Sequence, residues 1–222
     1  MICIPIMAHD NHDALKKMAE ATPLADILEL RLDLMETFDL KEIIRSAPKP
    51  VIVTYRSKKE GGQGKADYGT RVRYLMAAIR AGADFVDVEC SLPLDQRSRI
   101  FQDRGKTGII MSRHCLYETP IEENLRGFIR NMTATGADIV KIVTQAKTPE
   151  DNLRVLGLIS MAKNLGVKII AFCMGPHGRI SRVACTLMGG YLTFASLDTG
   201  QESASGQIPA TEMRKILGAL SL

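Results

Sequence analysis

The chain of 222 residues has no tryptophan, only 5% aromatic residues, and no apolar run of the roughly 18 residues that a membrane span requires. Its five cysteines are odd in number and stand singly, without a Cys-x-x-Cys pair. That pattern argues against a disulfide framework and a zinc site, so we expect reduced cysteines and no bound metal. The N-terminus lacks the basic, apolar and small-residue order of a secretion signal, which predicts a cytoplasmic protein.

Neither sign of charge dominates the sequence, because 29 basic and 25 acidic residues leave a formal net charge of only +4. The basic residues are scattered, and the nearest approach to a cluster is Arg56-Ser-Lys-Lys59. We therefore expect no nucleic-acid and no membrane partner, whereas a small anionic substrate would suit the mild positive bias. With 45% apolar residues the chain can bury one substantial core, which predicts a single domain over residues 1–222.

Eight strand-like apolar runs alternate with helix-like segments along the chain. The runs span residues 2–7, 27–32, 51–55, 85–88, 108–111, 139–143, 167–172 and 191–195. Amphipathic helical segments include residues 71–81, 121–135, 149–165 and 209–220. This alternation predicts an α/β protein whose parallel sheet closes most economically into a (β/α)8 TIM barrel. An open doubly wound sheet is the alternative, but no Gly-x-Gly-x-x-Gly follows the first run.

A repeated sequence motif places charged residues inside two of these strands. Residues 82–89 (GADFVDVE) are matched by residues 136–143 (GADIVKIV), so Lys141 takes the register of Asp87. Because side chains alternate along a strand, equivalent strands aim these opposite charges into one space. We expect Asp87 to help hold a cluster of lysine and carboxylates.

Barrel enzymes carry their catalytic groups at the C-terminal ends of the strands. The in-strand charges fall there: Glu29, Arg31 and Asp33 on the second run, Arg56 on the third, Asp87 and Glu89 on the fourth, Lys141 on the sixth. His114 directly follows the fifth run. Neighbouring strands lie about 4.8 Å apart, so Glu89, His114 and Lys141 can meet at one mouth. The longest irregular connection, residues 196–208, is a candidate active-site lid.

A carboxylate, a histidine and a lysine in one place can eliminate water from a hydroxyketone. A lysine enclosed by an apolar wall and other cations loses its proton more readily than in water, so Lys141 can attack a ketone and form an imine. The imine acidifies the neighbouring carbon. His114 can then remove that proton and protonate a β-hydroxyl leaving group, with Glu89 fixing the tautomer of the ring.

Each of these residues also has a purely structural interpretation. Lys141 can be a solvated charge at a strand end, and the charged triplet on the second run can be an ion-pair network. His114 can cap the following helix, and His177, in a turn sequence, is a weaker rival base. Residues 178–182 open a helix whose free N–H groups, with Arg182, would hold a carboxylate or a phosphate.

Taken in order, the charged segments resemble those of type I 3-dehydroquinate dehydratase, the Schiff-base enzyme of the shikimate pathway. The resemblance extends from Glu29 to Gln207, most of the chain. The matching segments are 29–33 (ELRLD), 54–56 (TYR), 60–62 (EGG), 87–89 (DVE), 112–114 (SRH), 119–120 (TP), Lys141, 174–182 (MGPHGRISR), 193–194 (TF) and 203–207 (SASGQ). Any one of these is common, whereas the ordered set is specific.

The resemblance implies dehydration of 3-dehydroquinate to 3-dehydroshikimate, the third step of the shikimate pathway toward chorismate and the aromatic amino acids, without cofactor or metal. Lys141 would form the imine with the C3 ketone, and His114 would take the C2 proton and assist loss of the C1 hydroxyl in a syn elimination. Glu89 would orient His114. The other implied roles are Arg182 for the substrate carboxylate, Glu29, Arg31 and Arg56 for ring hydroxyls, Met174 and Phe194 for the walls, and Ser203 with Gln207 on the lid. Family members are often dimers, so a homodimer is expected.

The sequence departs from that family at three places. Arg113 stands where an aromatic residue is usual, Cys115-Leu116 replaces an Asp-Phe pair, and Ser205 replaces a proline of the lid. None removes a reacting group. Arg113 is one residue out of register with His114, so we expect it to point away from the site.

Two other classes of protein stay open. A Schiff-base aldolase on the same barrel would also use an inward lysine, but the sequence offers no second lysine and no clear phosphate-binding pair after the last two strands. A binding-only barrel would keep the charged network without turnover. Three reacting groups at adjacent strand ends argue against that interpretation.

Overall fold

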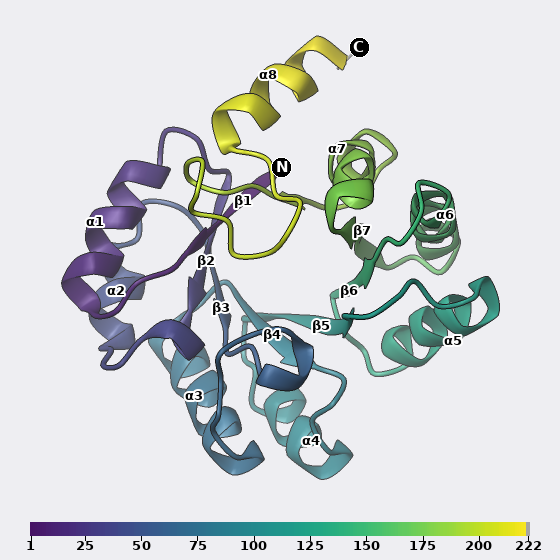
Figure 1. Ribbon diagram of the computed structural model, residues 1–222. Coiled ribbons are helices and arrows are strands. Elements are labelled where there is room, and N and C mark those ends of the chain that lie inside the picture. Colours follow the sequence, from purple (N-terminus) through teal and green to yellow (C-terminus); the bar gives the residue numbers. More distant parts are fainter. Residues whose placement is uncertain (221–222) are drawn as a thin grey trace.

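The computed structural model describes residues 1–220, within which eight strands alternate with eight α-helices. The strands are β1 (Ile2–Ile6), β2 (Ile27–Arg31), β3 (Val51–Thr54), β4 (Phe85–Glu89), β5 (Gly108–Cys115), β6 (Ile139–Gln145), β7 (Lys168–Met174) and β8 (Thr193–Phe194). The helices are α1 (Asn11–Ala21), α2 (Leu40–Ser46), α3 (Tyr68–Ala81), α4 (Leu94–Gln102), α5 (Glu122–Thr133), α6 (Asp151–Asn164), α7 (Arg179–Leu187) and α8 (Ala210–Leu220). Figure 1 shows the strands as an inner ring with helices around it, which confirms the predicted (β/α)8 barrel. Residues 221 and 222 of the predicted domain lie outside the described residues.

The strands are parallel and follow the order β7-β6-β5-β4-β3-β2-β1-β8. β8 has only two residues, and the segment before it approaches β7 through a hydrogen bond from Tyr191 N to Ile169 O of 2.7 Å. The barrel is therefore nearly closed. Since all strands run the same way, their C-terminal ends gather at one mouth.

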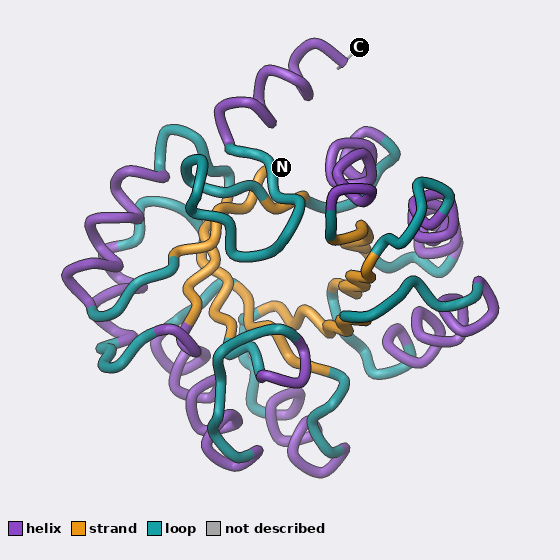
Figure 2. The backbone as a smooth tube through the Cα atoms, viewed as in Figure 1, coloured by secondary structure: helices purple, strands orange, loops and turns teal. Residues whose placement is uncertain are grey.

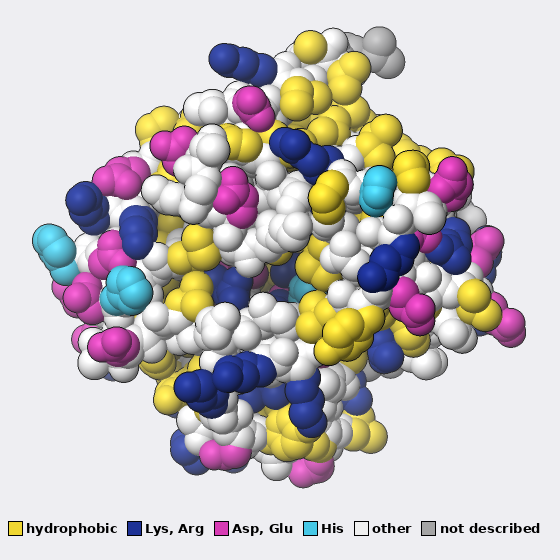
Figure 3. All heavy atoms as spheres, in the orientation of Figure 1, with side chains coloured by type: hydrophobic (Ala, Val, Ile, Leu, Met, Phe, Trp, Pro, Cys, Tyr) yellow, Lys and Arg dark blue, Asp and Glu magenta, His cyan; other side chains and the backbone are white. Residues whose placement is uncertain are grey.

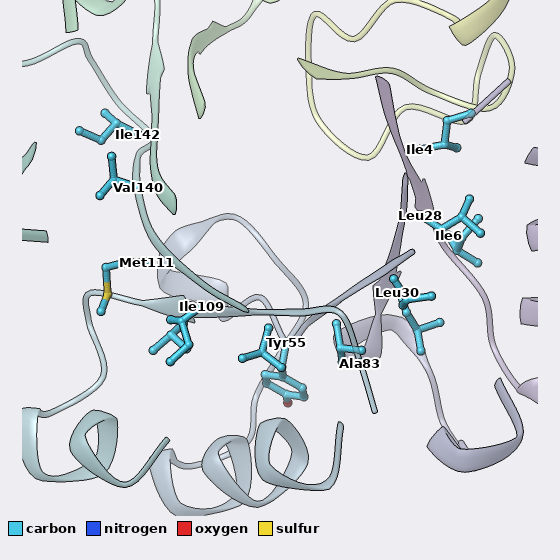
Figure 4. Packing of buried hydrophobic residues seen from close by; sticks show 14 of the residues in the cluster. Ile4, Ile6, Leu28, Leu30, Tyr55, Ala83, Ile109, Met111, Val140 and Ile142 are labelled. Carbon is cyan, nitrogen blue, oxygen red and sulfur yellow. The ribbon is translucent and has the colours of Figure 1, made fainter. Parts of the chain in front are cut away.

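Two apolar layers hold the barrel together. Outward side chains such as Leu28 and Val140 pack between the strands and the surrounding helices (Figure 4), and both are fully buried. Inward side chains form a second cluster that fills the barrel below the mouth. Its isoleucines are Ile27, Ile52, Ile110, Ile139 and Ile170. In Figure 2 the outer helices are purple and the inner strands, whose side chains contribute to both layers, are orange.

Several predicted boundaries were wrong. β5 continues to Cys115 and pairs with β6 as far as Thr144, although its apolar run ends at Met111. The run ends early because the last inward positions of this strand carry polar side chains. β8, expected over residues 191–195, is shorter, and α3 begins at Tyr68 because Asp67 caps it by accepting from Thr70 N.

The connection between β8 and α8, the predicted lid, lies over the barrel mouth in Figure 1. Gly175 N donates to Ser205 O at 3.1 Å, which attaches this segment to the end of β7. None of the helices described between residues 1 and 220 has the length and apolar character needed to cross a membrane.

Candidate active site

The mouth of the barrel holds a small pocket with a cavity volume of about 60 Å³. It is lined by the predicted residues Glu29, Arg56, His114, Lys141, Met174, Arg182, Phe194, Ser203 and Gln207, together with Val143, Phe172 and Ala204. Figure 3 shows the hollow on this face, with basic and histidine side chains visible inside it. The strand ends and the predicted lid therefore meet around one small pocket.

Lys141 lines this pocket and is only 5% exposed. Its Nζ is 3.2 Å from Asp87 Oδ2 and 3.6 Å from Glu29 Oε1, and it lies 4.2 Å from the centroid of the Phe194 ring. The repeated sequence motif thus predicted the meeting of Lys141 and Asp87 correctly. A buried amine held between acceptors and an aromatic wall has one defined position from which to attack.

Asp87 is shared between two cations. Arg56 Nη2 donates to Asp87 Oδ2 at 2.6 Å, the same oxygen that Lys141 approaches, and Ser112 Oγ donates to Asp87 Oδ1 at 2.5 Å. Burial alone would raise the pKa of the Asp87 carboxyl, but Arg56 and Lys141 bring it below its usual range. Asp87 is therefore a fixed negative charge under the lysine, which agrees with the role expected for it.

His114 meets a different carboxylate from the one predicted. Its Nδ1 lies 3.0 Å from Glu60 Oε2, and its backbone N donates to the same oxygen at 3.1 Å. Glu89 makes no such contact within the described residues, so the expectation that it orients the ring is corrected to Glu60. The physical reason is that the turn after β3 folds back over the mouth and brings Glu60 to the end of β5.

Burial, and then the positive charges of Arg56 and Lys141, hold the pKa of His114 well below its ordinary value. Burial also raises the pKa of Glu60, although Arg56 nearby opposes this. A histidine with a lowered pKa is neutral at neutral pH and can accept a proton.

Arg182 projects from α7 into the pocket and is 1% exposed. Its Nη2 donates to Ser205 O at 3.1 Å, and it lies over the Phe172 ring. Burial lowers its pKa to about 10. No acidic side chain pairs with it in the ion pairs described for residues 1–220. A buried guanidinium without a counter-charge is suited to an incoming anion.

The predicted lid residues Ser203 and Gln207 bond to each other rather than to the barrel wall. Gln207 Oε1 accepts from Ser203 N at 2.7 Å, and Gln207 Nε2 donates to Ser203 Oγ at 3.1 Å. In the segment predicted to hold an anion at the start of α7, Ser181 Oγ donates to Gly178 O and accepts from Cys173 N inside the fold. Only Arg182 of that segment lines the pocket.

Arg31 does not line the pocket. Its Nε and Nη2 each donate to an oxygen of Asp33 at 2.8 Å, so the ion-pair interpretation of the charged triplet describes these two residues. Glu29, by contrast, lines the pocket and accepts from Thr54 Oγ1 at 2.8 Å. Arg113 is exposed and stacks 3.8 Å from the Phe128 centroid, away from His114 as predicted.

Sequence reasoning missed Glu60 and Ser112 as site residues. Both lie inside segments that carry the family resemblance, directly after Arg56-Ser-Lys-Lys and two residues before His114. That spacing was the available signal, but which carboxylate reaches the histidine depends on the path of a turn. Among residues 1–220 no group of His, Cys, Asp and Glu is arranged to hold a metal ion.

Comparison with known proteins gives a consistent result. A family model described as type I 3-dehydroquinase matches residues 2–222. A 3-dehydroquinate dehydratase of Methanococcus maripaludis strain C5 is 36% identical over 219 residues, which cover 98% of both chains. A chloroplastic bifunctional 3-dehydroquinate dehydratase/shikimate dehydrogenase of Arabidopsis thaliana is 39% identical over 213 residues. That match covers 93% of this chain but only 35% of the plant protein.

A solved structure shows the same architecture. The 3-dehydroquinate dehydratase from Geobacillus kaustophilus HTA426 superposes with a TM-score of 0.90 at 31% identity. The superposition covers 99% of this chain and 90% of that one. Sequence family and three-dimensional fold thus point to the same group of proteins.

Proposed function

Because the chain belongs to the type I 3-dehydroquinase family and is a 3-dehydroquinate dehydratase of the shikimate pathway, we propose that it eliminates water through an imine on Lys141. The observation that carries the proposal is the position of Lys141, a buried amine at the base of a pocket whose wall also contains His114. Lys141 Nζ attacks the C3 carbonyl carbon to give a carbinolamine, and the imine forms as the hydroxyl of this intermediate leaves as water.

His114 is the proton carrier of the elimination. Glu60, when ionised, can only accept a hydrogen bond, so we assign the ring proton to Nδ1 and leave Nε2 as the base. His114 removes the C2 proton, and the electron pair moves into the imine to give an enamine. The electrons then return, the C1 hydroxyl leaves with the proton from His114, and water hydrolyses the product imine to free Lys141. One base serving both carbons makes the elimination syn.

Arg182 and the lid hold the substrate. The buried guanidinium of Arg182, with no acidic partner described for it, would bind the substrate carboxylate. Residues 196–208 form the lid over it. Ser203 and Gln207, which bond to each other at the pocket wall, would exchange that contact for substrate oxygens.

The remaining pocket residues would position the ring. Glu29 and Arg56 would bind ring hydroxyls, and Met174 and Phe194 would form apolar walls. Arg31 would reach a hydroxyl with the part of its guanidinium that Asp33 does not use.

Assembly and location are parts of the same proposal. We expect a homodimer, supported by apolar side chains on the outer face of α7 and just beyond it, where Ile180 is 65% and Met188 55% exposed. The cytoplasm is the expected compartment, in agreement with the free state of the cysteines.

Borohydride reduction in the presence of 3-dehydroquinate tests the proposal. We expect one reduced adduct on Lys141 by intact mass and peptide mapping. Lys141→Met should give none, whereas Lys168→Met, which removes a lysine outside the pocket, should be trapped like the wild type. Turnover without any trapped adduct would rule out the imine while leaving the dehydratase activity in place.

A further inference from the structure

The turn that carries Glu60 is held in place from two sides. It connects β3 to α3 and includes a short 3-10 helix at Lys58–Glu60. On one side Asp33 accepts hydrogen bonds from the backbone N of Arg56 at 3.2 Å and of Gln63 at 3.0 Å. These bonds fix the two ends of the turn to the end of β2, but they do not contact its middle.

Glu89 holds the other side of the turn. Its Oε1 accepts from Ser57 N at 2.8 Å and from Arg56 Nη1 at 3.1 Å, and its Oε2 accepts from Ser57 Oγ at 2.7 Å. Ser57 directly precedes the 3-10 helix that presents Glu60 to His114. Glu89 is 1% exposed, and these donors, with Ser91 Oγ at 3.1 Å, occupy a carboxylate's acceptor positions. Glu89 is thus a fixed anchor without a free position for moving a proton.

Arg71 completes this arrangement from outside the barrel. It lies on α3, is 4% exposed, and donates from Nη2 to Glu89 Oε2. Arg56 alone would have to balance several carboxylates, because it also contacts Asp87 at 2.6 Å and lies 3.8 Å from Glu60. A buried carboxylate with too little compensating charge is strongly destabilised. Arg71 supplies a second positive charge beside the Glu89 carboxylate and holds it in place.

We propose that Arg71 is a positioning residue of the dehydratase, which acts through Glu89 on the Ser57–Glu60 turn and so keeps Glu60 against His114. Arg71 does not line the substrate pocket and lies on the other side of the turn, in a groove with Lys58 and Tyr68. Its effect on turnover is therefore indirect. The inference rests on the proposed role of the Glu60–His114 contact.

A double-mutant cycle tests this route. Arg71→Met should lower kcat by about ten- to a hundredfold, because misplacing a catalytic group by about 1 Å can cost about a hundredfold, while KM changes by less than about threefold. In a Glu60→Ala background the same substitution should lower kcat less than about twofold, because the contact that Arg71 maintains has already been lost. Borohydride trapping at Lys141 should persist in all of these variants.

Arg73→Met is the matched control, because Arg73 lies on the same helix, carries the same charge and is exposed, with its contact to Thr70 Oγ1. It should retain wild-type kcat. Arg71→Lys should recover part of the kcat lost in Arg71→Met. If Arg71→Met does not fold, Glu89→Gln, which keeps the shape of the side chain, replaces it in the same cycle.

The outcomes separate the two proposals. Wild-type kcat in Arg71→Met, or an equal loss in both backgrounds, would overturn the positioning role and leave the role of Glu60 intact. Wild-type kcat in Glu60→Ala alone would overturn the proposed role of Glu60, and the inference with it.

Discussion

On β6 the inward side chain is isoleucine at position 139 and lysine at position 141, and the same step occurs on β2 from Ile27 to Glu29. One alternation along each strand therefore changes the barrel interior from an apolar floor to a charged mouth. The floor consists of closely packed aliphatic side chains, whereas the charges of Lys141, Asp87 and Arg56 at the mouth contact partners of opposite charge. We infer from this difference that the mouth serves the reaction and the floor serves stability. Substitutions in the two regions should therefore affect turnover and stability in opposite proportions.

Burying the charged side chains of the mouth costs free energy, and the apolar packing of the floor offsets that cost. Asp87 and Arg56 are each less than 5% exposed, and burying such charges is favourable only when pairing and hydrogen bonds compensate. Ile52 and Ile110 below them need only fill space. A substitution at the mouth should therefore change turnover more than stability, and one in the floor the reverse.

Lys141→Met is the strongest test of this division. It removes the only proposed nucleophile, so kcat should fall by about 10⁴-fold or more. Stability should change by less than about 1 kcal/mol, because Asp87 keeps Arg56 as its partner. Steady-state kinetics and urea unfolding of the same preparation check both halves. If the folded variant turned over substrate at the wild-type rate, another residue would have to be the nucleophile.

Asp87→Ala should have a smaller effect on turnover than Lys141→Ala. Asp87 holds Lys141 and Arg56 in position but is not proposed to react, so we expect a loss on the order of 10–100-fold. Side-by-side measurement of kcat decides the matter, and equal losses would mean that Asp87 takes part in the chemistry itself.

Ile52→Ala tests the floor. Ile52 is fully buried, and truncation of such a side chain costs about 2–5 kcal/mol. Urea unfolding should show this loss, while kcat of the folded protein stays within about twofold of the wild type. Leu153→Ala, at an exposed position of α6, is the control and should leave both quantities unchanged. A large loss of kcat in Ile52→Ala would show that floor and mouth are coupled.

Lowering the pH should reduce the stability of the protein through protonation of His114. Its folded-state pKa lies below the ordinary value, which is about 6.5, so the unfolded chain binds the proton more readily. His114 therefore reduces stability progressively as pH falls below about 6.5. Urea unfolding at pH 7 and pH 5 should show a larger loss for the wild type than for His114→Asn. Activity should persist below the ordinary histidine pKa, and an identical pH dependence of unfolding in the two proteins would contradict the assignment.

The sequence predicted the barrel well because its evidence is local. Eight apolar runs with alternating helices leave few ways to bury both faces of a parallel sheet. The position of Lys141 beside Asp87 followed from register alone, since β4, β5 and β6 are adjacent and parallel. Strand ends were harder to place, because β5 continues past its apolar run into residues that serve the pocket.

Contacts made by turns could not be predicted in this way. Glu60 reaches His114 because Gly61, at φ +86°, ends the 3-10 helix in the left-handed region, and the sequence does not specify the direction of that turn. The register of β4 placed Glu89 at the mouth as predicted. Its carboxylate, however, accepts hydrogen bonds from Ser57 in the turn after β3 rather than from His114. Assigning the carboxylate of His114 therefore required the structure.

The smallest expected effect concerns the lid, where this chain has Ser205 in place of the family's usual proline. Ser205 contributes its carbonyl oxygen, which accepts from both Gly175 N and Arg182 Nη2, and a proline keeps that oxygen. Ser205→Pro should restrict the open lid and lower KM by about two- to fivefold, which corresponds to the roughly 0.4–1 kcal/mol gained by such substitutions. The value of kcat should stay constant unless lid opening limits turnover. A raised KM would mean that the closed lid needs the flexibility of serine here, and that the mouth depends on mobility as well as on its charges.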